Sequence, residues 1–277
     1  MTAAPDRYAV IGHPIAHSRS PWIHAQFARQ TGQHLVYSAI DAEPGRFAER
    51  VQEFFAHGGR GLNVTVPHKQ AALALMAGVS ERARIAGAVN TIVRGPDDQL
   101  RGDNTDGIGL VRDLTHNLGV TVTGQRVLLL GAGGATRGLL APLLGLQPRE
   151  IAIANRAEDR AQELAALVSG RIPVRATGFA QLEGTHFELI INATAAGLRA
   201  ELPPLPVSVL RQAAVCYDLA YAHGTTQFAH WARACGVTRC YTGTGMLVEQ
   251  AAESFLLWRG VRPDTAAVVQ SLAAEAQ

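Results

Sequence analysis

Residues 127–138 read VLLLGAGGATRG and decide the fold, because an apolar run enters a glycine-rich turn that opens a helical pattern. Gly131 and Gly133 occupy the first two glycine positions of the GxGxxG motif, and Thr136 occupies the third. A backbone without Cβ atoms lets a pyrophosphate approach closely, and the free N–H groups at a helix start attract its charge. The alternative is a tight glycine turn without a ligand. The order of strand, turn and helix favours a dinucleotide site.

The next apolar run, EIAIA, points to the kind of dinucleotide. It ends at Asn155 and Arg156, and Arg160 follows one helical turn later. An NAD site usually carries an acidic residue here for the ribose 2′-hydroxyl, whereas arginine suits a 2′-phosphate. A solvated helix start is the alternative, since Glu158 and Asp159 suit a first helical turn. The arginines favour NADP(H).

Short apolar runs alternate with helical patterns along nearly the whole chain, which is typical of βαβ units around a mainly parallel sheet. The first series of runs is YAVIG, LVYSAI, GLNVTV and NTIVRG, separated by helical patterns at residues 20–30, 44–57 and 67–76. A second series begins with RVLLL and continues through EIAIA, FELIINAT, AAVCYDLAY and GVTRCYTG. The sequence therefore predicts an α/β protein of two domains.

The segments between and after the two series complete this organisation. Residues 113–124 carry a helix end and the loop NLGVTVTG, a natural crossing between domains. Residues 246–260 and 263–276 form two helical patterns with no strand between or after them. Helices that end an alternating chain in this way are expected to return and cover the first domain.

Composition excludes several classes of protein. The chain has 277 residues, of which 47% are hydrophobic and 17% charged, and a net charge of +2. This near-neutral balance predicts no general affinity for nucleic acid or for anionic membranes. No apolar run approaches the roughly 18 residues of a membrane span, and the N-terminus lacks the layout of a secretory signal. Three cysteines without CxxC spacing indicate reduced thiols in a cytoplasmic protein.

A lysine and an aspartate from separate segments are candidates for acid–base chemistry. In GLNVTVPHK, Pro67 suits the first position of a helix, so Lys69 falls in a first turn, where the helix dipole disfavours a cation. Such a lysine is a candidate proton donor, and an exposed lysine is the alternative. Asp106 begins the helical pattern after GDNT, where capping is its alternative role. Asn104, Thr105 and Asp106 form a polar cluster near the predicted domain junction, where ligand sites tend to lie.

The first loop, GHPIAHSRSPWIH, places the hydroxyls of Ser18 and Ser20 one residue apart and just before Pro21. Two short uncharged hydroxyls suit a small polar ligand, while Ser20 with Pro21 is also a good helix start. The three histidines of this loop match no zinc spacing, so no metal site is predicted.

Together these segments resemble the shikimate dehydrogenase family over almost the whole chain. The family's motifs occur in order as HSRSP, NVTVPHK, GAVNT, GDNTDGIG, GAGGA, NRAEDR, NAT and GMLVEQA. The resemblance implies a cytoplasmic enzyme that reduces 3-dehydroshikimate to shikimate with NADPH, in chorismate and aromatic amino-acid biosynthesis. It also implies an N-terminal α/β substrate domain (1–107 plus 245–277) and a Rossmann NADP-binding domain (108–244), with a cleft between them.

The resemblance further implies roles for individual residues. Lys69 and Asp106 match the catalytic pair. The residues that match substrate-binding positions are Ser18, Ser20, Thr65, Asn90, Tyr217 and Gln250. The residues that match cofactor-binding positions are Gly131, Ala132, Gly133, Gly134, Ala135, Asn155, Arg156, Arg160, Thr194, Gly243 and Met246.

The chain departs from the family's usual motifs at three places. Ala195 and Ala196 in NATAAG bring no hydroxyls where NATSSG is common, Ala157 replaces a threonine after the cofactor arginine, and HGTTQF replaces a proline-containing segment. These departures affect the expected cofactor preference and leave the expected substrate-binding residues unchanged.

Two other functions stay open. One is a quinate/shikimate dehydrogenase that prefers NAD, which the serine pair and Arg156 argue against. The other is a non-catalytic NADP-binding regulator on the same scaffold, which is expected to lack the pair formed by Lys69 and Asp106. For the implied shikimate dehydrogenase we expect a monomer or homodimer with a small-molecule substrate (shikimate or 3-dehydroshikimate) and no nucleic-acid or membrane partner.

Overall fold

The computed structural model describes residues 4–168, 170, 172–194, 201–211, 213–221 and 225–275, so Ala195, Ala196 and the start of the HGTTQF segment lie outside the described residues. The chain forms two compact units, Met1–Gly109 with Val248–Val268 (unit 1) and Leu110–Leu247 with Val269–Gln277 (unit 2). The sequence-based boundaries differ from these mainly at the end of the chain, where residues 269–277 group with unit 2.

Unit 1 is built on a six-stranded sheet in the order β2-β1-β3-β5-β6-β4. Strands β1, β2 and β3 are parallel, whereas β5 runs antiparallel to both of its neighbours, so this sheet is mixed. Parallel strands end at one edge of a sheet, so the loops after β1 and β3 lie together there. The strands are β1 (Asp6–Gly12), β2 (Leu35–Asp41), β3 (Gly59–Val64), β4 (Gly78–Val79), β5 (Thr91–Arg94) and β6 (Leu100–Asp103).

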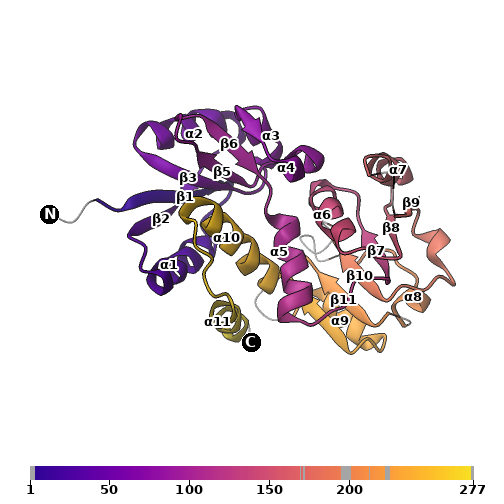
Figure 1. Ribbon diagram of the computed structural model, residues 1–277. Helices are drawn as coiled ribbons and strands as arrows, with labels where there is room; N and C mark the ends of the chain where they lie inside the picture. Colours follow the sequence, from indigo (N-terminus) through magenta and orange to yellow (C-terminus); the bar gives the residue numbers. More distant parts are fainter. Residues whose placement is uncertain are drawn as a thin grey trace. The chain divides into compact units, whose positions relative to one another are not determined.

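The helices of unit 1 cover this sheet (Figure 1). They are α1 (Ser20–Thr31), α2 (Phe47–Ala56), α3 (Lys69–Leu73), α4 (Glu81–Ala86) and, from Val248 onward, α10 (Thr244–Arg259); a short 3-10 turn, Pro44–Arg46, precedes α2. Phe255 of α10 is fully buried, and the Trp258 indole donates a hydrogen bond of 3.0 Å to the Ile92 carbonyl in β5. Helix α10 therefore packs on the sheet of unit 1. Most of α11 (Ala266–Glu275) groups with unit 2, so the expectation that both final helices cover the first domain fails for α11.

Unit 2 is a parallel six-stranded sheet in the order β12-β11-β10-β7-β8-β9. Counted from β7, this is the doubly wound Rossmann order, in which the direction of winding reverses between β7 and β10. Ligands of such sheets bind outside the carboxyl ends of the strands at that reversal. The strands are β7 (Arg126–Leu130), β8 (Glu150–Ala154), β9 (Val174–Thr177), β10 (Leu189–Asn192), β11 (Val215–Asp218) and β12 (Arg239–Thr242).

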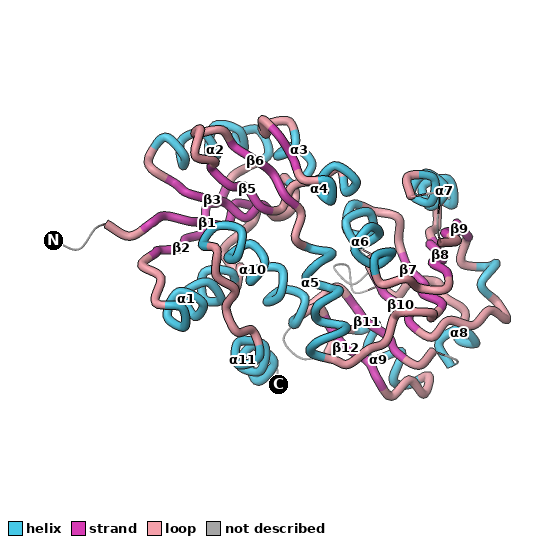
Figure 2. The backbone as a smooth tube through the Cα atoms, in the orientation of Figure 1, coloured by secondary structure: helices cyan, strands magenta, loops and turns pink. Residues whose placement is uncertain are grey.

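Both faces of the sheet in unit 2 are buried, and Figure 2 shows helices around its strands. The central strands are accordingly apolar without alternation, as RVLLL and EIAIA illustrate. The helices are α5 (Asp106–Arg112, in this unit from Leu110), a π-helical turn (Asp113–Asn117), α6 (Gly134–Gly145), α7 (Glu158–Ala166), α8 (Val207–Arg211), α9 (Gln227–Ala234) and α11 (Ala266–Glu275), with a 3-10 turn at Ala180–Leu182.

Two of the predicted helices differ from the observed ones. The helix predicted at residues 67–76 covers only Lys69–Leu73, so Pro67 precedes it and Lys69 is its first residue. The pattern at residues 44–57 is divided into a 3-10 turn and α2. Strands β4, β6 and β9 were not predicted, because each is short and has few apolar residues.

Candidate functional site

Lys69 and Asp106 form an ion pair in unit 1. The Lys69 Nζ donates to the Asp106 Oδ2 over 2.6 Å, and the two side chains are 29% and 15% exposed. Lys69 is the first residue of α3 after β3, and Asp106 is the first residue of α5 after β6. The pair is thus built from segments far apart in sequence, and it keeps partial access to solvent, as a pair that meets a ligand requires.

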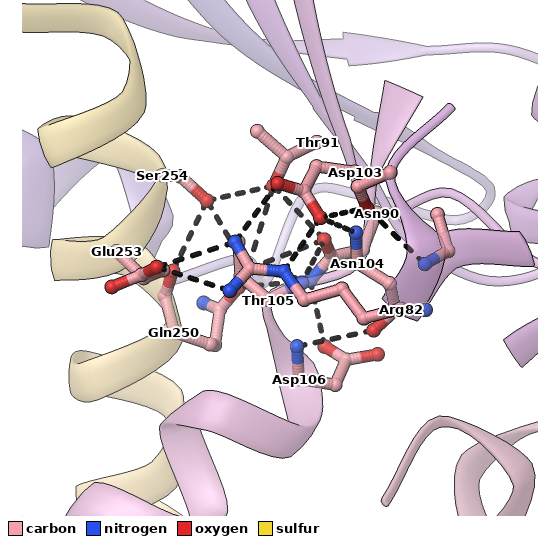
Figure 3. Close-up of polar contacts among 12 residues, drawn as sticks. Arg82, Asn90, Thr91, Asp103, Asn104, Thr105, Asp106, Gln250, Glu253 and Ser254 are labelled. Carbon is pink, nitrogen blue, oxygen red and sulfur yellow. Dashed lines mark hydrogen bonds and ion pairs between the residues drawn. The ribbon is translucent and has the colours of Figure 1, made fainter. Parts of the chain in front are cut away.

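Asn90 fixes the other oxygen of the Asp106 carboxylate. Its Nδ2 donates to the Asp106 Oδ1 over 2.8 Å, and it also reaches Thr105 Oγ1 and Gln250 Oε1. The Asn90 Oδ1 accepts from the Thr105 amide at 2.8 Å and from the Thr91 hydroxyl at 2.9 Å. Asn90 is only 2% exposed and lies at the centre of this network (Figure 3). It therefore orients the Asp106 carboxylate.

The capping role considered for Asp106 belongs to a neighbour. The Asp106 amide donates to the Asn104 Oδ1 at 3.2 Å, so Asn104 satisfies a free N–H group at the start of α5. The Asn104 Nδ2 in turn donates to the Ala88 carbonyl at 3.1 Å. The Asp106 carboxylate is left to bind side chains, Lys69 and Asn90.

Three of the predicted substrate residues follow strands that end at the same sheet edge. Ser18 and Ser20 lie on the loop and helix after β1, and Thr65 directly follows β3, the parallel neighbour of β1. The Ser18 Oγ accepts a hydrogen bond from the Ser20 amide. Ser20 is already the first helical residue, so the alternative role of Ser20 as the cap of α1 is not observed. Gln250 reaches the network from α10 through its 3.4 Å contact with Asn90.

Tyr217 has a different place from the one predicted. It lies on β11 in unit 2, is fully buried, and donates from its hydroxyl to the Asp113 Oδ2 at 2.7 Å. Burial, and then the charge of Asp113, raise its pKa well above the ordinary value, so the hydroxyl keeps its proton. This buried position corrects the substrate-binding prediction for Tyr217. The exposed tyrosine of this segment is Tyr221, at 48% exposure.

Gly243 and Met246 also lie in unit 2, where α10 begins. The Gly243 amide donates to the Ala220 carbonyl at 3.0 Å, and a side chain at Gly243 would collide with the backbone of Leu219. Met246 packs against the buried core cluster that contains Tyr217. The segment is therefore held closely against the carboxyl end of β11, the edge of the Rossmann sheet at which ligands bind.

A cavity of 610 Å³ in unit 2 contains most of the predicted cofactor residues. Its lining includes Gly131, Ala132, Gly133, Gly134, Ala135, Asn155, Arg156, Arg160 and Thr194. Gly131 has φ +98°, and Gly133 and Gly134 leave open space where a Cβ would stand, at the start of α6. This open, N–H-rich turn fits a pyrophosphate. Arg156 and Arg160 are exposed beside it and fit a further phosphate.

Thr136, at the third position of the glycine motif, binds the backbone of the turn. Its side chain is fully buried, and its hydroxyl donates to the Gly131 carbonyl at 2.7 Å. The buried hydroxyl therefore has a hydrogen-bond partner, and it stabilises the glycine turn.

Comparison with known proteins identifies the family. The family model of the shikimate dehydrogenase substrate binding domain matches residues 10–92. The model described as shikimate / quinate 5-dehydrogenase matches residues 113–199, and that of the shikimate 5'-dehydrogenase C-terminal domain matches residues 243–273. A curated relative, the shikimate dehydrogenase (NADP(+)) of Methylococcus capsulatus, is 55% identical over 98% of this chain and 97% of its own. The chain belongs to the shikimate dehydrogenase family.

Solved structures agree in fold. An Ael1 enzyme from Pseudomonas putida is 48% identical with a TM-score of 0.93, over 96% of this chain and 98% of its own. The shikimate 5-dehydrogenase of Thermus thermophilus, in complex with NADP(H) and shikimate, is 33% identical with a TM-score of 0.86, over 98% of this chain and 100% of its own. The predicted two-domain α/β fold, with a Rossmann domain, is thereby confirmed.

Four residues around the site were not predicted from the sequence: Arg82, Asp103, Glu253 and Ser254. Ser254 of α10 is fully buried and bonds the Thr91 and Asn63 side chains at 2.8 and 2.9 Å. The position of Asp103, directly before the polar cluster that begins at Asn104, is a signal that could have identified it.

Proposed function

We propose that the protein catalyses the reversible, NADPH-dependent reduction of 3-dehydroshikimate to shikimate, a step of chorismate and aromatic amino-acid biosynthesis. The observation that carries the proposal is the ion pair of 2.6 Å between Lys69 and Asp106. Its support is the identity with shikimate dehydrogenases (NADP(+)), which reaches 55% over nearly the whole chain. A non-catalytic regulator would have no use for such a pair.

Lys69 is proposed to handle the proton. Reduction puts a hydride on the carbonyl carbon and a proton on the oxygen, and NADPH, when bound, supplies the hydride. An ammonium carries three N–H donors, and Lys69 directs one of them at Asp106. Another can face the substrate oxygen, donate the proton during reduction and accept it back during oxidation. A positioned acid of this kind is worth about 10²–10⁴ in rate.

Asp106 is proposed to orient Lys69 and to bind a substrate hydroxyl. Its carboxylate is held at both oxygens, by Lys69 and by Asn90, so its direction is fixed before a ligand arrives. Preorganisation of this kind lowers the cost of reaching the reactive geometry. Ser18, Ser20, Thr65, Asn90 and Gln250 are proposed to bind the substrate's carboxylate and remaining hydroxyls.

The cofactor is proposed to be NADP(H), held in the cavity of unit 2. Gly131–Ala135 would hold the pyrophosphate, and Arg156 and Arg160 would hold the 2′-phosphate. Asn155, Thr194, Gly243 and Met246 complete the proposed cofactor set. The supporting feature is that two exposed guanidinium groups line the cavity beside the glycine turn, where an NAD site usually carries an acidic residue.

The test is a spectrophotometric assay of NADP⁺ and NAD⁺ reduction with shikimate and with quinate, in all four combinations. Shikimate with NADP⁺ is expected to give the highest kcat/KM. Quinate with NAD⁺ as the best combination would favour the quinate/shikimate alternative. The absence of turnover in all four would overturn the proposal.

We also propose that the enzyme works in the cytoplasm as a monomer or homodimer, on a small-molecule substrate. Among the helices in the described part of the chain, none has the length and apolar character to cross a membrane. Light scattering coupled to size-exclusion chromatography gives the oligomeric state.

A further inference from the structure

A continuous chain of ion pairs runs through unit 1 beside the proposed active site. We call it the ion-pair chain, and it consists of Asp103, Arg82, Glu253, Arg262 and Glu249. Consecutive members carry opposite charges and are joined by N–O distances of 2.6, 3.2, 2.8 and 3.0 Å. Figure 3 shows Arg82 between Asp103 and Glu253 of α10. Arg82 is the member that joins the strand side to the helix side.

On the strand side, Arg82 binds the residue from which the catalytic segment begins. Its Nε and Nη2 donate to the two oxygens of Asp103 over 2.6 and 2.8 Å, a bidentate pair. The Asp103 Oδ1 also accepts from the Asn104 amide at 2.6 Å, and the Asp103 carbonyl accepts from the Asn90 amide at 3.0 Å. Asp103 therefore fixes the backbone at both Asn104 and Asn90.

These two asparagines are the residues that orient Asp106. Asn104 accepts from the Asp106 amide, and Asn90 donates to the Asp106 carboxylate. Arg82 is thus connected to Asp106 through Asp103 and then through Asn104 and Asn90. Arg82 itself makes no contact with Lys69 or Asp106 among its described hydrogen bonds and ion pairs.

On the helix side, Arg82 is bonded to α10 through Glu253. Both of its terminal nitrogens reach the Glu253 Oε1 at 3.2 Å. Glu253 lies one helical turn after Gln250, a proposed substrate residue, and Arg262 holds its other oxygen at 2.8 Å. The ion-pair chain ends at Glu249, which is fully buried and directly precedes Gln250. The Glu249 carboxylate also accepts a hydrogen bond of 2.6 Å from the Thr265 hydroxyl. Two turns of α10 are therefore anchored from both sides of Gln250.

The burial of these groups makes Arg82 hard to replace. The Arg82, Asp103 and Glu253 side chains are 23%, 13% and 13% exposed. Without the guanidinium, two poorly solvated carboxylates would face a space with no cation between them, which is unfavourable. The groups around Asp103 would then move to find water or other donors. Asn90 and Asn104 would move with them.

We propose that Arg82 is a positioning residue of the reaction: it holds the segment that carries Asp106 in register with α10, which carries Gln250. This inference rests on the proposed function. It predicts a loss in the chemical step, because the direction of the Asp106 carboxylate depends on Asn90 and Asn104. It also predicts weaker substrate binding, because Asn90, Asp106 and Gln250 are proposed substrate residues. A displacement of about 1 Å at a reacting group can cost a factor of about 10² in rate.

The experiment compares Arg82→Met and Arg82→Lys with the wild-type protein and with Arg84→Met. Arg84 is the matched control, because it lies on the same helix and pairs with Glu81 at the surface, with side chains 66% and 68% exposed. For each variant, kcat and KM are measured for reduction of 3-dehydroshikimate, per folded molecule. The primary deuterium isotope effect on kcat is measured with NADPH deuterated at the transferred position.

Arg82→Met is expected to lower kcat by about 10–100-fold and also to raise the KM for 3-dehydroshikimate, since proposed substrate residues move with the network. Its isotope effect is expected to rise, since the chemical step becomes slower than the other steps. Arg82→Lys keeps the charge but loses the bidentate geometry, so its kcat should lie between that of the wild type and that of Arg82→Met. Arg84→Met should match the wild type.

A purely structural role for Arg82 predicts a lower Tm with unchanged kcat and isotope effect per folded molecule, and that result would overturn the inference. If Arg82→Met does not fold, the decision passes to Arg82→Lys, for which a wild-type kcat is the contrary result. An inactive wild-type protein would instead contradict the proposed function. The two failures are thereby distinguished.

Discussion

The buried histidine His24 predicts a pH dependence of the stability of unit 1. Its ring is 1% exposed and stacks on Tyr37 with a centroid distance of 4.1 Å and an interplanar angle of 5°. Phe27, Phe255 and Trp258 surround it with centroid distances between 5.4 and 6.2 Å. Burial among these rings lowers the pKa of His24 from 6.5 to about 3.

The sign follows from where the proton binds. Between pH 6.5 and about 3 the unfolded chain carries a proton on His24 that the folded chain does not, so lowering the pH through this window favours unfolding. At pH 5 the unfolded group lies 1.5 pH units below its pKa of 6.5, and each unit corresponds to about 1.4 kcal/mol. His24 should therefore remove about 2 kcal/mol from the free energy of unfolding at pH 5, relative to pH 7.

The assay is urea unfolding at pH 7 and pH 5, for the wild type and for His24→Phe. Both are made with Trp231→Phe, so that the fluorescence of Trp22 and Trp258 reports unit 1 alone. His24→Phe keeps an aromatic ring but cannot take up a proton. It is expected to lose about 2 kcal/mol less than the wild type between the two pH values.

Substitution of the exposed His34 by Gln is the control and should leave the wild-type difference unchanged. Equal losses of stability in the wild type and in His24→Phe would refute the argument. They would mean that the buried ring takes up its proton without cost.

Two further predictions concern unit 2. Arg156→Gln removes a charge-assisted contact worth about 1.5–3 kcal/mol, so steady-state kinetics should give a KM for NADP⁺ about 10–100-fold higher, with the KM for NAD⁺ nearly unchanged; a parallel rise for both cofactors would argue against a 2′-phosphate contact. Gly245→Ala would bring a methyl group into collision with the Asp113 carboxylate. Overpacking of this kind costs about 1–3 kcal/mol, so calorimetry should record a Tm lower by several degrees, and an unchanged Tm would contradict the close packing of Gly245.

The sequence predicted the Rossmann half well, because its signals are local. The strands β7 and β8 are mostly apolar runs. The glycine-rich turn that follows β7 is typical of a site for the phosphates of a dinucleotide. The first unit was harder to predict. Its strand β6 reads LRGD and β4 has only two residues, so their pairing depends on neighbours that a local pattern cannot reveal.

The candidate site was predictable in its residue types and less so in its contacts. The motifs around Lys69 and Asp106 identify both residues, but they do not reveal that Asn90 is buried and binds the Asp106 carboxylate. The substrate-binding prediction for Tyr217 was wrong for a related reason. In a parallel sheet covered on both faces, all four residues of β11 are buried, so alternation does not indicate which side chain meets a ligand.

The central claim is that Lys69, oriented by Asp106, moves the proton of the reaction. The most direct measurement is kcat for NADPH-dependent reduction of 3-dehydroshikimate by Lys69→Met, together with the Kd of shikimate for the same variant. The account predicts a kcat lower by about 10²–10⁴ and a Kd within a few-fold of the wild type. A variant with nearly wild-type turnover would contradict it.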